Sequence, residues 1–175
     1  LYAAARCGVY CPPKHWEIIL KHWLDTQQDK GSKFQPKPRK DPFNKSATTV
    51  TPRAVEARGW NYTDASGADE SDATHTMTCA GIASVRIAWA CLCQVDKGAG
   101  AKYAPQVAAS LESGLAWLEK NYTFSQASFS SWYYYYVYGF ERACVIYGVH
   151  ALGEHNWYYE GASVLCNMPR PAQNV

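Results

Sequence analysis

Residues 148–165, GVHALGEHNWYYEGASVL, repeat the order of landmarks in residues 8–24, GVYCPPKHWEIILKHWL. Each stretch opens with a Gly-Val pair, passes through a short turn and reaches a tryptophan, which is followed eight positions later by a leucine. A glycine before an apolar run indicates the end of one helix and the approach of the next. The repeat therefore predicts helical hairpins, and because one hairpin cannot bury both of its faces, neighbouring hairpins must stack.

Hydrophobic periodicity predicts six helices in and around these stretches. In the second of them, Trp16, Ile19, Leu20, Trp23 and Leu24 follow the spacing of a single helix face. The chain is thus expected to be all-α, with three hairpins in one domain over residues 1–175. The expected helices span Leu1–Val9, Pro13–Gln28, about 72–94, Pro105–Asn121, Ser131–Leu152 and Asn156–Met168.

Two interruptions separate these helices. Residues 97–100, Lys-Gly-Ala-Gly, predict a turn before a new helix begins at Pro105. The longer interruption, about 29–72, holds four prolines and few aliphatic residues, so it is read as an irregular insertion. Its aromatic end, Gly59-Trp60-Asn61-Tyr62, is expected to return to the core.

Composition limits the classes of partner. The net charge of +2 is too small to predict binding to nucleic acid, and no apolar run reaches about 18 residues, so no membrane span is expected. No cysteine pair has C-x-x-C spacing. Thiols inside helices pack as small hydrophobes, and reduced core cysteines favour a reducing compartment such as the cytoplasm. The cysteines inside predicted helices are Cys79, Cys91, Cys93, Cys144 and Cys166.

Four stretches resemble the prenyltransferase and squalene-cyclase repeat: residues 59–62, 76–84, 134–143 and 148–162. They are most similar to uncharacterised bacterial proteins built from such repeats. The resemblance implies an α/α-toroid, a ring of about six helical hairpins, of which three would supply about half. It also implies that the remaining repeats of the same chain, or a second copy, cover the open sides of this partial ring.

The catalytic acid motif of this family is not matched. Squalene–hopene-type cyclases use Asp-x-Asp-Asp-Thr, and the nearest cluster here, Asp69-Glu70-Ser71-Asp72, lacks the central aspartate pair. Asp69, Asp72 and Glu141 are the candidate catalytic residues, although Asp72, like Thr74, also fits the N-cap of a helix. A terpenoid-cyclase-like enzyme that acts on a polyprenyl substrate is therefore the alternative function.

Protein prenyltransferases of the same family hold zinc with Asp, Cys and His side chains. Asp72, His75 and Cys79 share one predicted helix face and could form such a set. Packing explains Cys79 as well, because small residues such as Gly81 and Ser84 keep that helix open to the close approach of another. We therefore expect no metal and no cofactor.

The aromatic run Trp132–Tyr138 points to a ligand site. On a helix, Tyr134 and Tyr138 share one face, with Glu141 and Arg142 a turn further along. If this face borders the concave centre of a toroid, it would bind a hydrophobic or sugar ligand. Alternatively, the rings pack between helices and use their hydroxyls as hydrogen-bond donors. The expected ligand-binding residues are Trp60, Tyr62, Tyr134, Tyr138, Arg142 and Trp157.

Glu141 and Arg142 are adjacent on a mostly apolar helix. Since a buried charge needs a partner, at least one of them is expected to form a structural ion pair. The leading function is thus ligand or partner binding in an aromatic-lined concave centre. Besides the cyclase alternative, a purely structural repeat within a larger chain is the third possibility.

Overall fold

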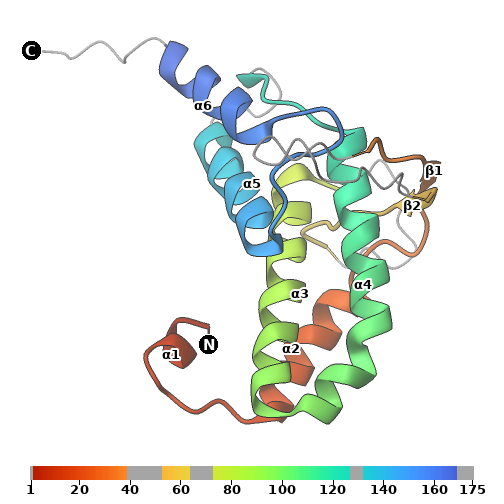
Figure 1. The fold of residues 1–175 in the computed structure, drawn as a ribbon, viewed down its shortest axis with the longest axis vertical. Helices are drawn as coiled ribbons and strands as arrows, with labels where there is room; N and C mark the ends of the chain where they lie inside the picture. The colour runs from red at the N-terminus through yellow and green to blue at the C-terminus, as the bar shows by residue number, and fades with distance from the viewer. Residues whose placement is uncertain (1, 39–52, 64–72, 127–131, 169–175) are drawn as a thin grey trace, which may run out of the picture.

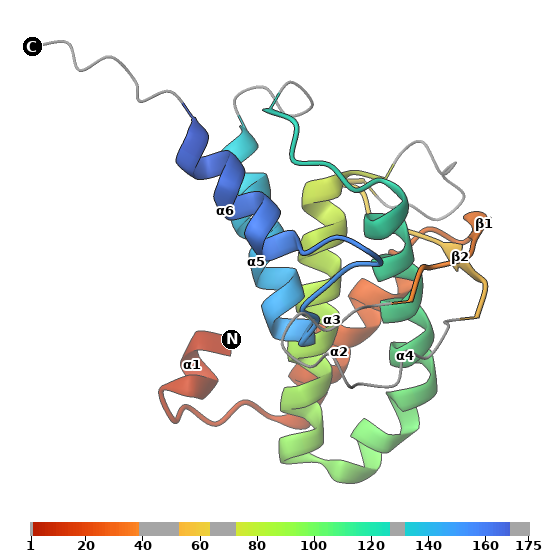
Figure 2. The same cartoon turned by 45° about the horizontal axis from the view of Figure 1, so that its top comes forward.

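The computed structural model describes residues 2–38, 53–63, 73–126 and 132–168 (Figures 1 and 2). Over these ranges the chain is mostly helical, which confirms the all-α prediction. The helices are α1 (Tyr2–Arg6), α2 (Pro13–Asp25), α3 (His75–Val95), α4 (Lys97–Lys120), α5 (Tyr133–Tyr147) and α6 (Trp157–Asn167), and the strands are β1 (Ser32–Phe34) and β2 (Val55–Ala57).

Helix α3 is central, with α5 on one side and α2 and α4 on the other (Figure 1). The hydroxyl of Thr74 accepts the backbone N–H of Met77 at 3.3 Å, so Thr74 is the N-cap. The spacing of Met77, Gly81, Ser84, Val85, Ala88 and Leu92 predicts one packed face of this helix. Gly81, Val85, Ala88 and Leu92 are buried, whereas Met77 and Ser84 are half-buried. The buried residues of α3 are Thr78, Cys79, Gly81, Ile82, Val85, Ala88, Cys91 and Leu92.

Among the described residues, α3 is the one helix whose length and composition would allow it to cross a membrane. A helix at the centre of a folded protein has the same composition, because it buries more than one face. In this structure α3 packs against α2, α4 and α5. Its apolar character therefore does not distinguish a membrane span from a core helix.

Helix α4 begins at Lys97 and not at Pro105, so the predicted turn over residues 97–100 is wrong. Asp96 alone separates α3 from α4, and its carboxylate caps α4 by accepting a backbone N–H of the first turn at 3.0 Å. Gly100 packs directly on Cys93, where a larger side chain would collide with the sulfur. The glycine therefore permits a tight helix–helix connection. The three- and four-residue spacing of Val107, Leu111, Leu115, Leu118 and Tyr122 predicts one buried face. The first four are buried in α4, whereas Tyr122 is half-buried just beyond its end.

The predicted insertion contains one element that periodicity did not indicate, the antiparallel pair of β1 and β2. Helix α2 ends at Asp25, before the predicted Gln28, and the two glutamines that follow it turn into the core. Gln28 Oε1 accepts the backbone N–H of Gly59 at 2.9 Å. The side-chain amide of Gln27 donates to the carbonyls of Arg58 and Ser110, each at 3.0 Å. These bonds fasten the described ends of the insertion to α4.

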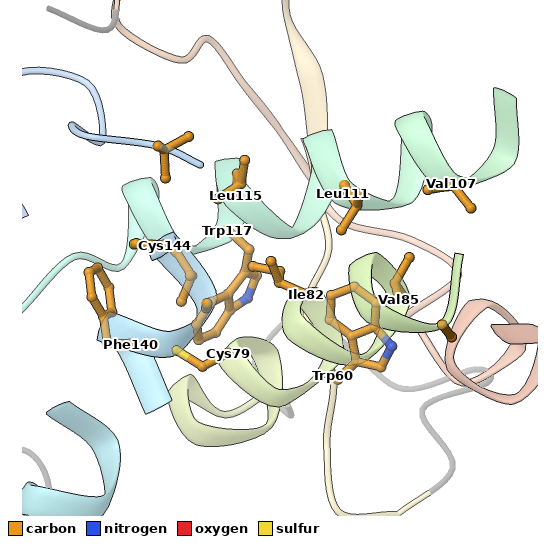
Figure 3. Close-up of a cluster of buried hydrophobic side chains, with 14 of the residues drawn as sticks. Trp60, Cys79, Ile82, Val85, Val107, Leu111, Leu115, Trp117, Phe140 and Cys144 are labelled. Atoms are coloured by element: carbon orange, nitrogen blue, oxygen red, sulfur yellow. The ribbon is translucent and has the colours of Figure 1, made fainter. Parts of the chain in front are cut away.

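Trp60 brings the end of the insertion into the core, as predicted, and is 1% exposed. Its indole lies between α3 and α4 (Figure 3), against Gly81 and Gly114. The indole N–H donates to the carbonyl of Trp23 at 2.7 Å. The small-residue face of α3 was expected to admit a neighbouring helix. At Gly81 it admits this indole instead.

The backbone at Gly8 and Gly148 reproduces the sequence repeat. Both glycines have positive φ, 84° and 89°, a conformation that side chains disfavour. At both sites the N–H of the following valine donates to the carbonyl five positions earlier, at 3.0 Å, which is the hydrogen bond of a Schellman helix end. Helix α5 consequently ends at Tyr147, well before the predicted Leu152.

The three predicted hairpins differ in how closely their arms pair. Helices α3 and α4 are packed along their length. Helices α5 and α6 run antiparallel, since Tyr134 at the start of α5 contacts Met168 just after α6. Helix α1 contacts α3 and stands apart from α2 in both views (Figures 1 and 2). The closure of such hairpins into a ring stays a prediction.

Candidate functional site

The tyrosines at the start of α5 divide between the core and the surface. Tyr133 and Tyr136 are buried. Their hydroxyls donate to the backbone carbonyls of Phe124 at 3.0 Å and Thr123 at 2.9 Å, respectively. Burial raises the pKa of the Tyr136 hydroxyl well above its ordinary value, so the hydroxyl keeps the proton that it donates. For these two rings the packing alternative is correct.

Tyr134 and Tyr138 face α6, and each is 61% exposed. They line a groove of about 330 Å³ between the two helices, which we call the α5–α6 groove. The shared face that was predicted from their four-residue spacing is therefore confirmed. Trp157 and Tyr158 line the groove from α6, and the buried ring of Phe140 lies at its base.

Contacts between the two helices bound the groove along its length. Near the start of α5, the Tyr134 hydroxyl donates to the sulfur of Met168 at 3.5 Å. Toward the other end, the rings of Phe140 and Trp157 lie 6.3 Å apart, centroid to centroid. The indole N–H of Trp157 donates to the carbonyl of Val149 at 3.0 Å, which fixes the ring of this predicted ligand residue. Trp157 thus both anchors the start of α6 and lines the groove.

Sequence reasoning missed the residues that give the groove its depth. Phe124, in the segment after α4, lies under α6, and a side chain at Gly161 would approach its ring to 3.1 Å. Gly161 therefore lets α6 approach this ring, and Ala162 beside it leaves open space. The small pair at 161–162 within an aromatic helix was the one available signal. It says nothing by itself about which ring it faces.

A polar cluster supports the first turn of α6. The ring of Tyr122 stacks on His155 with centroids 3.9 Å apart, and His155 Nδ1 lies 3.2 Å from Glu160 Oε2. Burial, and then the nearby Glu160, raise the pKa of Tyr122 well above its ordinary value, so its hydroxyl stays protonated. The cluster ties the end of α4 to α6 and lies outside the groove lining.

Glu141 and Arg142 do not need buried partners, because both are exposed. The expectation that one of them is buried in an ion pair is therefore wrong, since both lie on the exposed side of α5. Glu141 lines the α5–α6 groove, whereas Arg142 does not. Of the candidate acids, Glu141 is thus beside the groove. Asp69 and Asp72 lie outside the described residues.

The predicted ligand residues on the insertion are placed elsewhere. Trp60 fills the core between α3 and α4 (Figure 3). Tyr62 is 69% exposed on the segment before α3, with its hydroxyl 3.3 Å from that of Thr76. The structure therefore gathers Tyr134, Tyr138 and Trp157 around one groove and leaves Trp60, Tyr62 and Arg142 outside it.

The His75 and Cys79 side chains are engaged in packing. His75 Nε2 donates to the carbonyl of Asn121 at 2.8 Å, and its ring meets those of Trp117 and Tyr136 edge-on. Burial lowers the pKa of His75. Burial, and then the nearby Cys144 thiol, raise the pKa of Cys79 well above its ordinary value. The described part of the chain contains no group of three or more His, Cys, Asp or Glu side chains placed to hold a metal.

The seven cysteines all lie in the described ranges, where no disulfide joins them, and five lie in helices as predicted. Cys79 and Cys144 meet in the core between α3 and α5 (Figure 3).

Comparison with known proteins adds no relative: no family model, no curated protein and no solved structure matches this chain.

Proposed function

We propose that this chain is a ligand-binding helical module and that its α5–α6 groove receives a small hydrophobic or sugar-like ligand. The observation that carries the proposal is the convergence of exposed aromatic rings on one groove with a buried aromatic base. Its volume of about 330 Å³ lies in the range of small-molecule sites, which are mainly apolar with a few polar groups. Here the tyrosine hydroxyls and the Glu141 carboxylate are those polar groups.

Hydrogen bonds to backbone carbonyls fix the groups that support the groove. Tyr136 and Tyr133 fasten the segment that carries Phe124, and the Trp157 indole is fixed by its bond to Val149. A ligand therefore meets a base that is already formed, and little ordering free energy opposes binding.

We also propose that the hairpins belong to a larger α/α-toroid, completed by further repeats of the same chain or by a second copy. The matching helix ends at Gly8 and Gly148 support a repeated unit. The cyclase alternative needs a catalytic acid, for which the candidates are Asp69, Asp72 and Glu141. Asp69 and Asp72 lie outside the described residues, and Glu141 beside the groove is a single exposed carboxylate without the paired aspartates of the cyclase motif. The proposal therefore stays with binding.

Ligand-observed NMR with a panel of small apolar, aromatic and sugar fragments tests the proposal on the full chain. An Ala162→Trp variant should block the groove and remove the binding seen with the original protein. Val145→Trp is the matched control, because Val145 is 56% exposed on α5 and does not line the groove.

Circular dichroism of both variants checks that they remain folded. If no fragment binds, or if binding survives in Ala162→Trp as well as in Val145→Trp, the groove is not a ligand site.

A further inference from the structure

We infer that the ligand of the α5–α6 groove is a small organic cation with an alkylated ammonium head, such as a quaternary ammonium compound. This inference rests on the proposed function and specifies the chemistry of the ligand. It follows from two features of the groove, its set of electron-rich rings and the sign of its single formal charge.

The rings are Tyr134 and Tyr138 from α5, and Trp157 and Tyr158 from α6. Tyr134 and Tyr138 are each 61% exposed and Tyr158 is 65% exposed, so part of each ring is not committed to packing. Trp157 is 6% exposed and adds little accessible ring surface. The faces of tyrosine and tryptophan rings carry negative potential and attract cations, and quaternary ammonium groups are recognised by several such rings around one site. Two helices here supply rings from opposite sides of the same groove.

The charge of the groove has the matching sign. Glu141 is the one charged residue among the described residues that line it. Arg142 is adjacent in sequence but does not line the groove, and Glu160 faces His155 at the start of α6. A cation in the groove therefore meets a carboxylate and no described lysine or arginine, whereas an anionic ligand would meet repulsion.

The polar groups favour an alkylated head over a primary ammonium. A primary ammonium carries three donors and loses strong hydration unless it finds three acceptors. The tyrosine hydroxyls and one carboxylate offer few acceptors around a mainly apolar surface. An alkylated head has apolar methyl groups that gain from burial against rings while the charge remains.

The size of the groove favours a free small molecule. Tyr134 contacts Met168 and Phe140 contacts Trp157, so the two helices are joined beside the groove. A head group with a short tail fits within about 330 Å³, whereas a long chain would have to leave the groove.

Isothermal titration of the full chain with choline and with 3,3-dimethyl-1-butanol, its uncharged isostere, tests the inference. The two probes have nearly the same shape, so their affinity ratio reports the charge. We expect choline to bind about tenfold more tightly, which is the ratio that a partly desolvated cation–π contact of typical strength produces.

Three variants locate the effect. Tyr138→Leu should weaken choline binding severalfold, and Glu141→Gln should weaken choline while leaving the isostere unchanged. Tyr135→Leu is the matched control, because Tyr135 is 54% exposed on the same helix but does not line the groove. Its affinity for choline should equal that of the original protein.

Equal binding of choline and the isostere would overturn the cationic ligand and leave the groove as an apolar site. Absence of binding by both probes would also overturn it, and the fragment panel would then decide separately whether the groove binds anything. Loss of choline affinity in Tyr135→Leu but not in Tyr138→Leu would place the site elsewhere. Tyr138-dependent binding to phosphatidylcholine vesicles, without binding of free choline, would contradict the free small molecule.

Discussion

The contact between Gly81 and Trp60 allows a quantitative test of the core that supports the groove. An added Cβ at position 81 would overlap the Trp60 indole. The indole cannot easily move away, because its N–H is bonded to the Trp23 carbonyl at 2.7 Å and its other edge lies against Gly114. In an ordinary helix interior, a Gly→Ala change stabilises by about 1 kcal/mol. Overpacking a filled core costs about 1–3 kcal/mol.

We therefore expect Gly81→Ala to lower the free energy of unfolding by about 1 kcal/mol in net terms. Urea unfolding followed by circular dichroism measures this difference. Gly98→Ala is the control: Gly98 is also helical, but a Cβ there would lie 3.4 Å from the Asp96 carboxylate, an ordinary contact. That change should be neutral or stabilising.

A second background separates overlap from other effects of the added methyl group. In a Trp60→Leu protein the same Gly81→Ala change should stabilise by up to about 1 kcal/mol, because the smaller side chain vacates the space and only the helix preference for alanine remains. If Gly81→Ala is as stable as the original protein, with an unchanged dependence on urea, the indole does not occupy the place described here.

Three further outcomes follow from the same structure. Thr74→Ala should lower the free energy of unfolding by about 1 kcal/mol, with Thr74→Asn restoring most of it, because the cap of α3 is lost and regained. Maleimide labelling read by mass spectrometry should modify exposed Cys166 in the native protein and buried Cys79 only after unfolding, and equal rates would contradict the packing of α3. Burial holds the pKa of His75 in the folded protein below its ordinary value of 6.5. As the pH drops below 6.5, the unfolded chain therefore binds a proton at His75 more readily than the folded protein, and the free energy of unfolding should fall. His75→Gln should flatten that part of the stability curve, and an unchanged slope would show that another group causes it.

Sequence patterns correctly predicted buried helix faces where the apolar residues follow one helical period. The three- and four-residue spacing of Val107, Leu111, Leu115 and Leu118 placed one face of α4 in the core, and the structure buries all four. The same reasoning did not predict where α4 begins. Residues 97–100 contain two glycines, which usually interrupt a helix, but here Asp96 caps the helix and Gly100 relieves a contact with Cys93.

The site was predictable on one helix and not across two. Tyr134 and Tyr138 share a face by their spacing alone, whatever packs beside them. The opposite wall of the groove comes from α6. The position of α6 depends on the turn after Gly148 and on the hydrogen bond from the Trp157 indole to the Val149 carbonyl, which orients the helix. Trp60 was predicted both to return to the core and to bind a ligand, since its aromatic character fits either place equally well, and only the first prediction is correct. Only the facing glycines of α3 and α4 decide for the core.

The most direct test of the central claim is a methyl NMR titration of the full chain with the best-binding fragment of the panel and, separately, with choline. The methyl groups of Ala162 and Val137 line the α5–α6 groove, whereas those of Val145 lie on α5 outside it. We predict that the signals of Ala162 and Val137 shift together and saturate with one dissociation constant, while the signals of Val145 stay in place. Saturating shifts at Val145 without shifts at Ala162 and Val137, or no saturating shift at any of them, would contradict the assignment of the groove as the binding site.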